Sequence, residues 1–210
     1  MILLLFTILI GLIPLILVFF RKNKNTDEVS NLFPFLIIVF IASLYELIGS
    51  IILKINVNYW FVIYDLLVFI TLFYFFYRII RRYRLLFFIF FTLFTLLLFY
   101  LFLNYSFDDF FIISPYFKGF QTIFILTFSI LWFRKLFNER IIENLIDCSV
   151  FYFISGLIIY YCGTFFLFLL NDFIYKSDEK AFHDFWLLNI ILNLVLRTLL
   201  IVGIWKARAK

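Results

Sequence analysis

The sequence predicts an all-α protein, a polytopic transmembrane bundle of seven helices that forms a single domain over residues 1–210. Hydrophobic residues make up 66% of the 210 residues, whereas a soluble domain is closer to half apolar. The apolar residues gather in seven runs, each about as long as a bilayer is thick. Short charged segments separate these runs, so no soluble domain is expected on either side of the membrane.

The first run, residues 2–20, is expected to stay in the protein as a membrane span. A secretory signal would carry positive charge before its apolar run and a small-residue cleavage site after it. This run has neither feature, and three basic residues follow it instead.

Capping residues predict where three later spans begin. Asn31 with Pro34 and Ser114 with Pro115 each combine a helix-capping side chain with a proline that fits a first helical turn. Asp184 is the expected cap of the last span. The seven predicted spans are residues 2–20, 32–53, 59–80, 85–103, 115–133, 149–170 and 185–205.

Basic residues are distributed unequally between the two sides of the predicted bundle. The segments after the first, third and fifth spans, together with the C-terminal tail, carry 13 Lys and Arg residues. The other side carries four, namely Lys54, Lys118, Lys176 and Lys180. Because Lys and Arg accumulate on the cytoplasmic side, the N-terminus is predicted outside and the C-terminus inside. A multi-pass protein of the bacterial inner membrane is expected.

A layer of polar side chains is predicted inside the membrane. In the last span, Asn189, Asn193 and Arg197 follow an i, i+4, i+8 spacing that puts them on one helix face. Counting from the loops at 1.5 Å per residue puts polar groups of five helices roughly 10–14 Å below the outer surface. The residues of this predicted ligand-binding layer are Glu46, Asp65, Gln121, Thr164, Asn189, Asn193 and Arg197.

Two interpretations of this layer stay open, and they are compatible. An ion within the bilayer costs about 3 kcal/mol, so Arg197 is expected to face a carboxylate, water or a ligand. One interpretation is an interhelical ion pair, with Glu46 preferred over Asp65 because Ser43 and Ser50 share the face of Glu46. The other is a solvated or ligand-filled cavity open to the outside.

Residue types argue against several known chemistries. A retinal protein needs a lysine in the last span, where this chain has Arg197. His183 is the only histidine, so neither a Ser/His protease nor a zinc hydrolase is expected. Cys148 and Cys162 are about 21 Å apart along one predicted helix, too far for a disulfide. No catalytic residue, metal, cofactor or nucleic-acid partner is predicted.

The chain resembles uncharacterised seven-span integral membrane proteins of Bacteroidota. The resemblance is one of overall form across the whole chain, and it includes Tyr45-Glu46-Leu47-Ile48-Gly49, Asn58-Tyr59-Trp60 and the asparagines of the last span. It implies the seven-span fold and carries over no activity. Span count and orientation also match seven-helix receptors and sugar transporters, which is an analogy of fold alone.

The polar layer predicts a small sensor or receptor module that binds a small ligand or lipid headgroup from outside. The alternative is a transporter of small solutes, proton-linked if Glu46 or Asp65 titrates. A third reading is a lipid-modifying membrane enzyme that uses the same acids. Expected partners are the lipid bilayer and a cytoplasmic or membrane protein at the basic inner loops. The ligand and the oligomeric state stay open.

Overall fold

A computed structural model of the chain describes residues 2–20, 27–53, 58–106, 110–139, 145–170 and 179–207, and every regular element among them is helical. Seven of these helices are long and apolar enough to cross a membrane, which confirms the predicted class and span number. The elements are α1 (Ile2–Phe20), α2 (Asp27–Tyr45), η2 (Glu46–Ile52), α3 (Asn58–Ile79), η3 (Arg81–Tyr83), α4 (Arg84–Asn104), α5 (Phe110–Glu139), η4 (Leu145–Asp147), α6 (Ser149–Leu169) and α8 (Glu179–Lys206).

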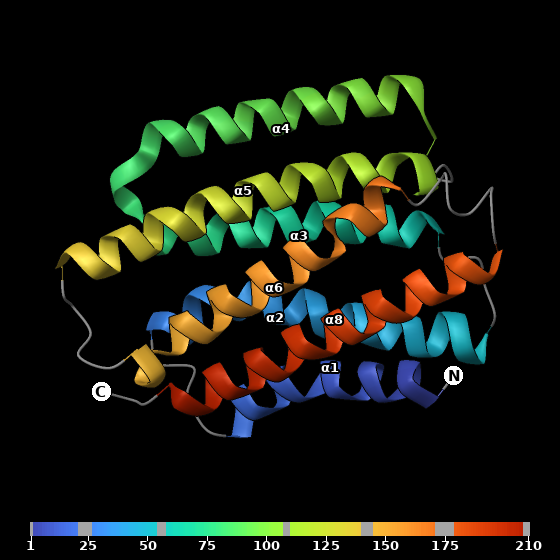
Figure 1. Cartoon of the computed structure of the whole chain (residues 1–210), viewed down its shortest axis with the longest axis horizontal. Coiled ribbons are helices and arrows are strands. Elements are labelled where there is room, and N and C mark those ends of the chain that lie inside the picture. The colour runs from blue at the N-terminus through green and yellow to red at the C-terminus, as the bar shows by residue number, and fades with distance from the viewer. Residues whose placement is uncertain are drawn as a thin grey trace.

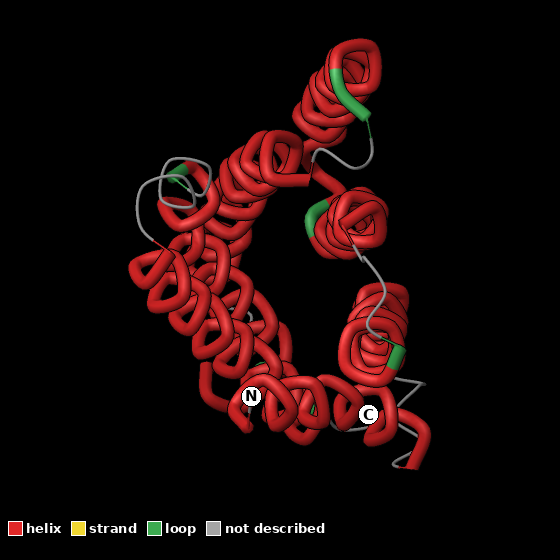
Figure 2. The backbone as a smooth tube through the Cα atoms, turned by 90° about the vertical axis from the view of Figure 1, so that its right-hand side faces the viewer, coloured by secondary structure: helices red, strands yellow, loops and turns green. Residues whose placement is uncertain are grey.

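Six of the long helices form a closed ring. Each contacts two neighbours, in the order α1, α2, α3, α5, α6, α8 and back to α1. Figure 2 looks along the helices and shows these six around a common interior, with α4 outside the ring. In Figure 1, α4 lies beyond α5 at the edge of the bundle. The order of the ring decides which polar side chains can meet.

Aromatic side chains attach α4 to the outside of the ring. The ring of Phe94 in α4 stacks on Phe69 of α3 with centroids 3.7 Å apart, and Phe87 of α4 stacks on Phe128 of α5 at 4.0 Å. Such pairs add to the packing of lipid-embedded helices, which lack a hydrophobic driving force toward one another. The two threonines of α4 donate to carbonyls of their own helix, so α4 brings no polar group to the interior.

Three long helices begin earlier than the capping residues predict. α2 starts at Asp27, whose charge with that of Glu28 suits the positive end of the helix dipole. Asn31 is therefore inside the helix, where its Oδ1 accepts a hydrogen bond from Arg78 Nε at 3.2 Å. α5 starts at Phe110, five residues before the predicted start.

The last helix is extended in the same way, and parts of the connecting segments lie outside the described residues. α8 starts at Glu179, so Asp184 is inside it as an exposed side chain. Nine of the basic residues that predict the orientation lie outside the described part of the chain, namely Arg21, Lys22, Lys24, Lys54, Arg140, Lys176, Arg208, Lys210 and the side chain of Lys180. The side chains of Ser50 and His183 also lie outside it.

The end of α2 widens into a π-helical segment. Glu46–Ile52 continues the helix with this wider turn, and Leu53 N donates to Ile48 O at 2.9 Å, an i to i+5 bond. Single π turns inside helices are frequent at functional sites. Here the segment begins at Glu46, one of the predicted site residues.

Close helix packing in the ring depends on Gly203 of α8. A Cβ at this position would meet the buried ring of Phe153 and lie 3.1 Å from the Ser149 carbonyl oxygen. Gly203→Ala is therefore expected to lower the thermal unfolding midpoint in detergent, because α8 must move away from α6.

Gly119→Ala is the matched control for this prediction. Its nearest neighbour would be a Phe165 ring atom at 3.9 Å, an ordinary contact. Alanine favours a helix over glycine by up to about 1 kcal/mol, so this variant should equal or exceed the wild type in stability. Equal effects of the two substitutions would contradict the described packing of α6 on α8.

Candidate functional site

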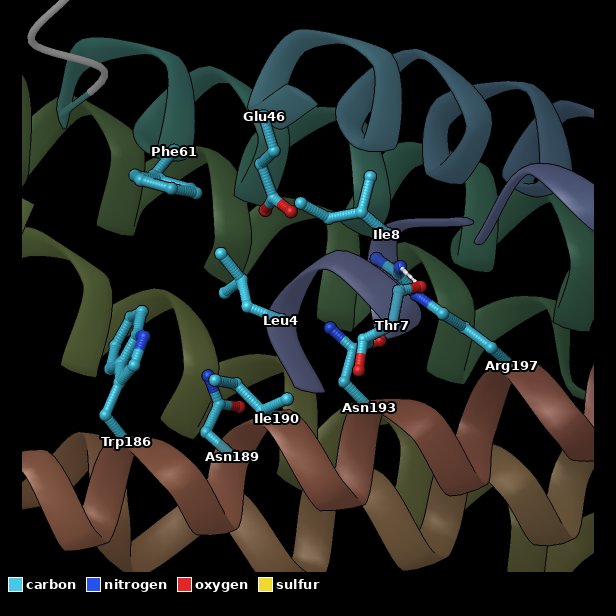
Figure 3. A pocket seen from close by; sticks show the side chains of 10 residues that line it. All are labelled: Leu4, Thr7, Ile8, Glu46, Phe61, Trp186, Asn189, Ile190, Asn193 and Arg197. Atoms are coloured by element: carbon cyan, nitrogen blue, oxygen red, sulfur yellow. Dashed lines mark hydrogen bonds between the residues drawn. The ribbon is translucent and has the colours of Figure 1, made fainter. Parts of the chain in front are cut away.

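The interior of the ring contains a polar cavity at the end where α1 begins. It has two compartments with volumes of about 230 Å³ and about 70 Å³. Both are lined by Glu46 from the start of η2, Phe61 from α3, and Trp186, Asn189, Asn193 and Arg197 from α8. We call this space the polar cavity; Figure 3 shows its larger compartment.

Arg197 forms the deep wall of the polar cavity. Its side chain is only 4% exposed, and Nη1 donates to the Thr7 carbonyl oxygen of α1. Nε is buried without a hydrogen-bond partner. The guanidinium fits against α1 because Gly11 lacks a side chain; a Cβ there would lie 2.8 Å from Arg197 Cζ. The protein thus satisfies only part of the hydrogen-bonding capacity of this cation.

Glu46 brings a negative charge to the same cavity from another helix. The side chain is half-buried, and its carboxylate points into the space between α2 and α8 (Figure 3). No salt bridge of 4.0 Å or less joins it to Arg197, although both side chains are among the described residues. The predicted direct pair is therefore wrong in this structure. The two charges act on each other only at a distance.

Asp65 pairs with Lys118, a residue that the sequence did not assign to the site. Lys118 Nζ of α5 lies 2.6 Å from Asp65 Oδ1 of α3, and Ser114 Oγ donates to Asp65 Oδ2 at 3.2 Å. Gln121 Nε2 donates to the Asp65 carbonyl oxygen at 2.7 Å, and Gln121 Oε1 accepts a hydrogen bond from the Tyr161 hydroxyl of α6 at 3.0 Å. We call these five residues the Asp65–Lys118 cluster. It connects three consecutive helices of the ring.

Aromatic rings complete the surroundings of Lys118. Its Nζ lies 5.7 Å from the ring centroids of Tyr64 and Tyr161 and 5.3 Å from that of Phe168. Cations are attracted to aromatic faces at such distances, and more strongly where water is excluded. Lys118 is 5% exposed, so it is an interior residue and contributes nothing to the loop charge from which orientation was predicted.

The structure separates the seven predicted site residues into groups. Glu46, Asn189, Asn193 and Arg197 line both compartments, and Asp65 lines the smaller one. Gln121 belongs to the Asp65–Lys118 cluster. Thr164 is buried and donates to the Tyr160 carbonyl of its own helix, away from both compartments.

Trp186 and Thr7 also line the cavity, although the sequence pattern did not indicate a site role for them. Trp186 looks like an interfacial anchor, yet it is half-buried and lines the polar cavity beside Asn189. Thr7 contributes its backbone carbonyl, which no side-chain pattern reveals. Lys118 did carry a signal, because Ser114, Lys118 and Gln121 share one helix face at i, i+4 and i+7.

The acidic residues of the described polar layer have different surroundings. A proton-sharing dyad needs two carboxylates in contact, whereas both Asp65 oxygens are held by Lys118 and Ser114. Within the described ranges, no three His, Cys, Asp or Glu side chains come together. The Oδ1 of Asn189 is buried without a partner, which adds an unsatisfied acceptor to the unsatisfied Arg197 Nε.

Comparison with protein-family models, curated proteins and solved structures gives no match. The function therefore has to be inferred from the geometry of this chain. The polar cavity and its incompletely satisfied groups are the basis for that inference.

The Asp65–Lys118 pair should behave as a buried structural ion pair. Asp65→Asn or Lys118→Met alone leaves one buried charge unpaired, at a cost of about 3–5 kcal/mol of unfolding free energy. The double variant should recover most of that loss. The measurement is thermal or denaturant unfolding of all three variants in the same detergent.

The exposed Lys206–Asp147 pair, with N and O 3.1 Å apart, is the matched control. Exposed pairs contribute about 0–1 kcal/mol, so the same double-mutant cycle there should show little coupling. Strictly additive losses for Asp65 and Lys118 would contradict the pairing described here.

Proposed function

We propose that this chain is a small-ligand-binding membrane protein of the sensor or receptor type, with the ligand in the polar cavity. The observation that carries the proposal is Arg197, a 4% exposed cation whose only described hydrogen bond goes to a backbone carbonyl. A buried charge is costly unless it is paired, and an intramembrane ionisable residue by default suggests a functional site. A bound ligand or water would complete its surroundings.

The proposed orientation makes the polar cavity face outside. The 13 basic residues on the opposite side remain its main support, and removing the buried Lys118 from the other side strengthens the asymmetry to 13 against three. The proposed location is the bacterial inner membrane, and with this orientation the ligand would be extracytoplasmic.

An apolar floor beneath the polar cavity favours a sensor over an open pathway. Phe75 of α3 and Phe153 of α6, two helices that are not neighbours in the ring, have ring centroids 6.5 Å apart. Both side chains are fully buried, as is Leu200, one turn beyond Arg197 on α8. A ligand in the cavity would press on α1, α2 and α8 and could shift their packing without crossing the membrane.

A proton-linked transporter is the second candidate, with Glu46 as the titrating group. Glu46 has no ion pair or hydrogen bond in the described part of the chain, whereas Asp65 is held by Lys118. Substrate-dependent flux in proteoliposomes distinguishes the two functions, because a sensor binds the ligand without moving it across the bilayer.

On the inner side, a partner protein or an anionic lipid would respond to the helix movement. The proposed contact is a second cavity of about 410 Å³ between the α3–α4 turn and the end of α5. Its charged residues are all basic, namely Arg81, Arg82, Arg134 and Lys135. Basic juxtamembrane residues attract anionic headgroups by about 1 kcal/mol each.

Cysteine labelling in intact cells tests the proposed orientation. In a background without Cys148 and Cys162, a cysteine at Ser106 or Asp184 should react with a membrane-impermeant thiol reagent, and one at Asn138 should react only after the cells are opened. The reason is the unequal distribution of Lys and Arg. The reverse pattern would contradict both the orientation and the outward-facing site.

Labelling from within the polar cavity tests whether it is open to a ligand. Asn193→Cys should react with a small charged thiosulfonate, because Asn193 lines both compartments. Thr198→Cys is the control, since Thr198 is exposed on the outer surface of α8, which lipid would cover. Failure of Asn193→Cys to react, with the protein folded, would remove the basis for a ligand site.

A further inference from the structure

The polar cavity keeps two opposite charges that do not neutralise each other. Arg197 comes from α8 and Glu46 from the end of α2, and both line both compartments. These helices are not neighbours in the ring, and within the described residues no salt bridge of 4.0 Å or less joins the two groups. Figure 3 shows them on different walls, with Ile8 and Thr7 of α1 between them.

The second pair of charges at this depth behaves differently. Asp65 and Lys118 are in direct contact at 2.6 Å, so their charges largely cancel. The Arg197 guanidinium and the Glu46 carboxylate are therefore the two charged groups of the polar cavity that do not contact an opposite charge. The protein does not fully satisfy either group, because Arg197 donates only from Nη1 and its Nε is buried without a partner, and Glu46 has no hydrogen bond in the described part of the chain.

We infer that the polar cavity binds a zwitterion, a small molecule with an ammonium group and an acidic oxyanion on one short skeleton. This inference rests on the proposed function and names its ligand class. The oxyanion accepts hydrogen bonds from the Arg197 guanidinium, and the ammonium donates to the Glu46 carboxylate. The ligand thus supplies the oppositely charged hydrogen-bonding partners that the protein does not provide.

The remaining walls fit the skeleton of such a molecule. Leu4 and Ile8 of α1 and Phe61 of α3 give an apolar surface for short methylene chains. Trp186 presents an aromatic ring, which attracts an ammonium group. Asn189 and Asn193 add amide donors and acceptors on the face of α8 that also carries Arg197.

The volume indicates a small ligand. The larger compartment has a volume of about 230 Å³. This size suits an amino acid or the headgroup of an aminophospholipid.

Singly charged and neutral molecules fit less well. An anion alone would be attracted by Arg197 and repelled by Glu46. A cation alone would be attracted by Glu46 and repelled by Arg197. A neutral molecule would leave both charges without a partner. Separated opposite charges therefore select against all three classes.

Two sources can supply this chemistry, a free amino-acid-type solute and a zwitterionic aminophospholipid. Purified full-length protein in detergent can be titrated with leucine, 4-aminobutyrate and phosphoethanolamine, followed by calorimetry and thermal unfolding. Butyrate and butylamine serve as singly charged probes. At least one zwitterion should bind and raise the unfolding midpoint, and the singly charged probes should not at the same concentration.

The lipid arm uses nanodiscs of phosphatidylglycerol with or without phosphatidylethanolamine. If the natural source is the headgroup, phosphatidylethanolamine should raise the unfolding midpoint and compete with the soluble probes. If the source is a free solute, the probes should bind equally in both nanodiscs. Either result supports the zwitterion and distinguishes its source.

Substitutions of Glu46 and Arg197 test whether each side chain binds the ligand group of opposite charge. Glu46→Gln and Arg197→Gln should each weaken zwitterion binding by roughly tenfold to a hundredfold, the usual effect of losing one charge-assisted hydrogen bond. Arg197→Lys retains the charge and serves where Arg197→Gln fails to fold. Asp147→Asn, in the exposed pair far from the cavity, should bind as the wild type does.

The outcomes separate this inference from the proposed function. If a singly charged probe binds as tightly as every zwitterion, or if Asn193→Cys is labelled but no zwitterion binds, the zwitterion inference is overturned and the ligand-accessible cavity stands. If Asn193→Cys is not labelled and no probe binds, both are overturned.

Discussion

A guanidinium held inside the apolar bundle constrains the helices around it. Arg197 is nearly fully buried, and its Nη1 donates to the Thr7 carbonyl on the neighbouring α1. This contact requires α1 and α8 to be close, and Gly11 permits the approach. Because leaving such a charge unsatisfied in a membrane costs several kcal/mol, the closure of the ring and the position of the polar cavity both depend on how Arg197 is accommodated.

The polar groups at this depth have two physical roles. In the Asp65–Lys118 cluster every charge has a direct partner, and the cluster connects α3, α5 and α6 into one side of the ring. On the other side, α1, η2 and α8 supply most of the lining of the larger compartment, where Glu46 and Arg197 remain apart, and the smaller compartment extends to Asp65 and Lys118. We therefore expect the first side to be the rigid part, and the second to respond to a ligand, because its packing is completed only on binding.

The sequence predicted the helices, but not the partners of the polar residues. Hydropathy is sufficient for seven spans, and counting from the loops put Glu46, Asp65 and Asn193 at one level, with Arg197 one turn deeper. The pairing depends on the order of the helices in the ring, which hydropathy does not contain. α3 contacts α5, so Asp65 meets Lys118, whereas α8 contacts α1 and α6, which leaves Arg197 with a carbonyl of α1. Lys118 was missed because α5 begins five residues earlier than Pro115 indicates, which moves Lys118 from the predicted first turn into the bundle.

The central claim is that Glu46 and Arg197 are held apart for a ligand instead of being paired with each other. A double-mutant cycle of Glu46→Gln and Arg197→Gln on the unfolding free energy, measured without ligand, tests it most directly. Separated charges predict a coupling energy below about 1 kcal/mol, comparable to that of an exposed pair. A coupling of about 3 kcal/mol or more, the range of a buried salt bridge, would show that the two residues form a structural pair and would contradict the account.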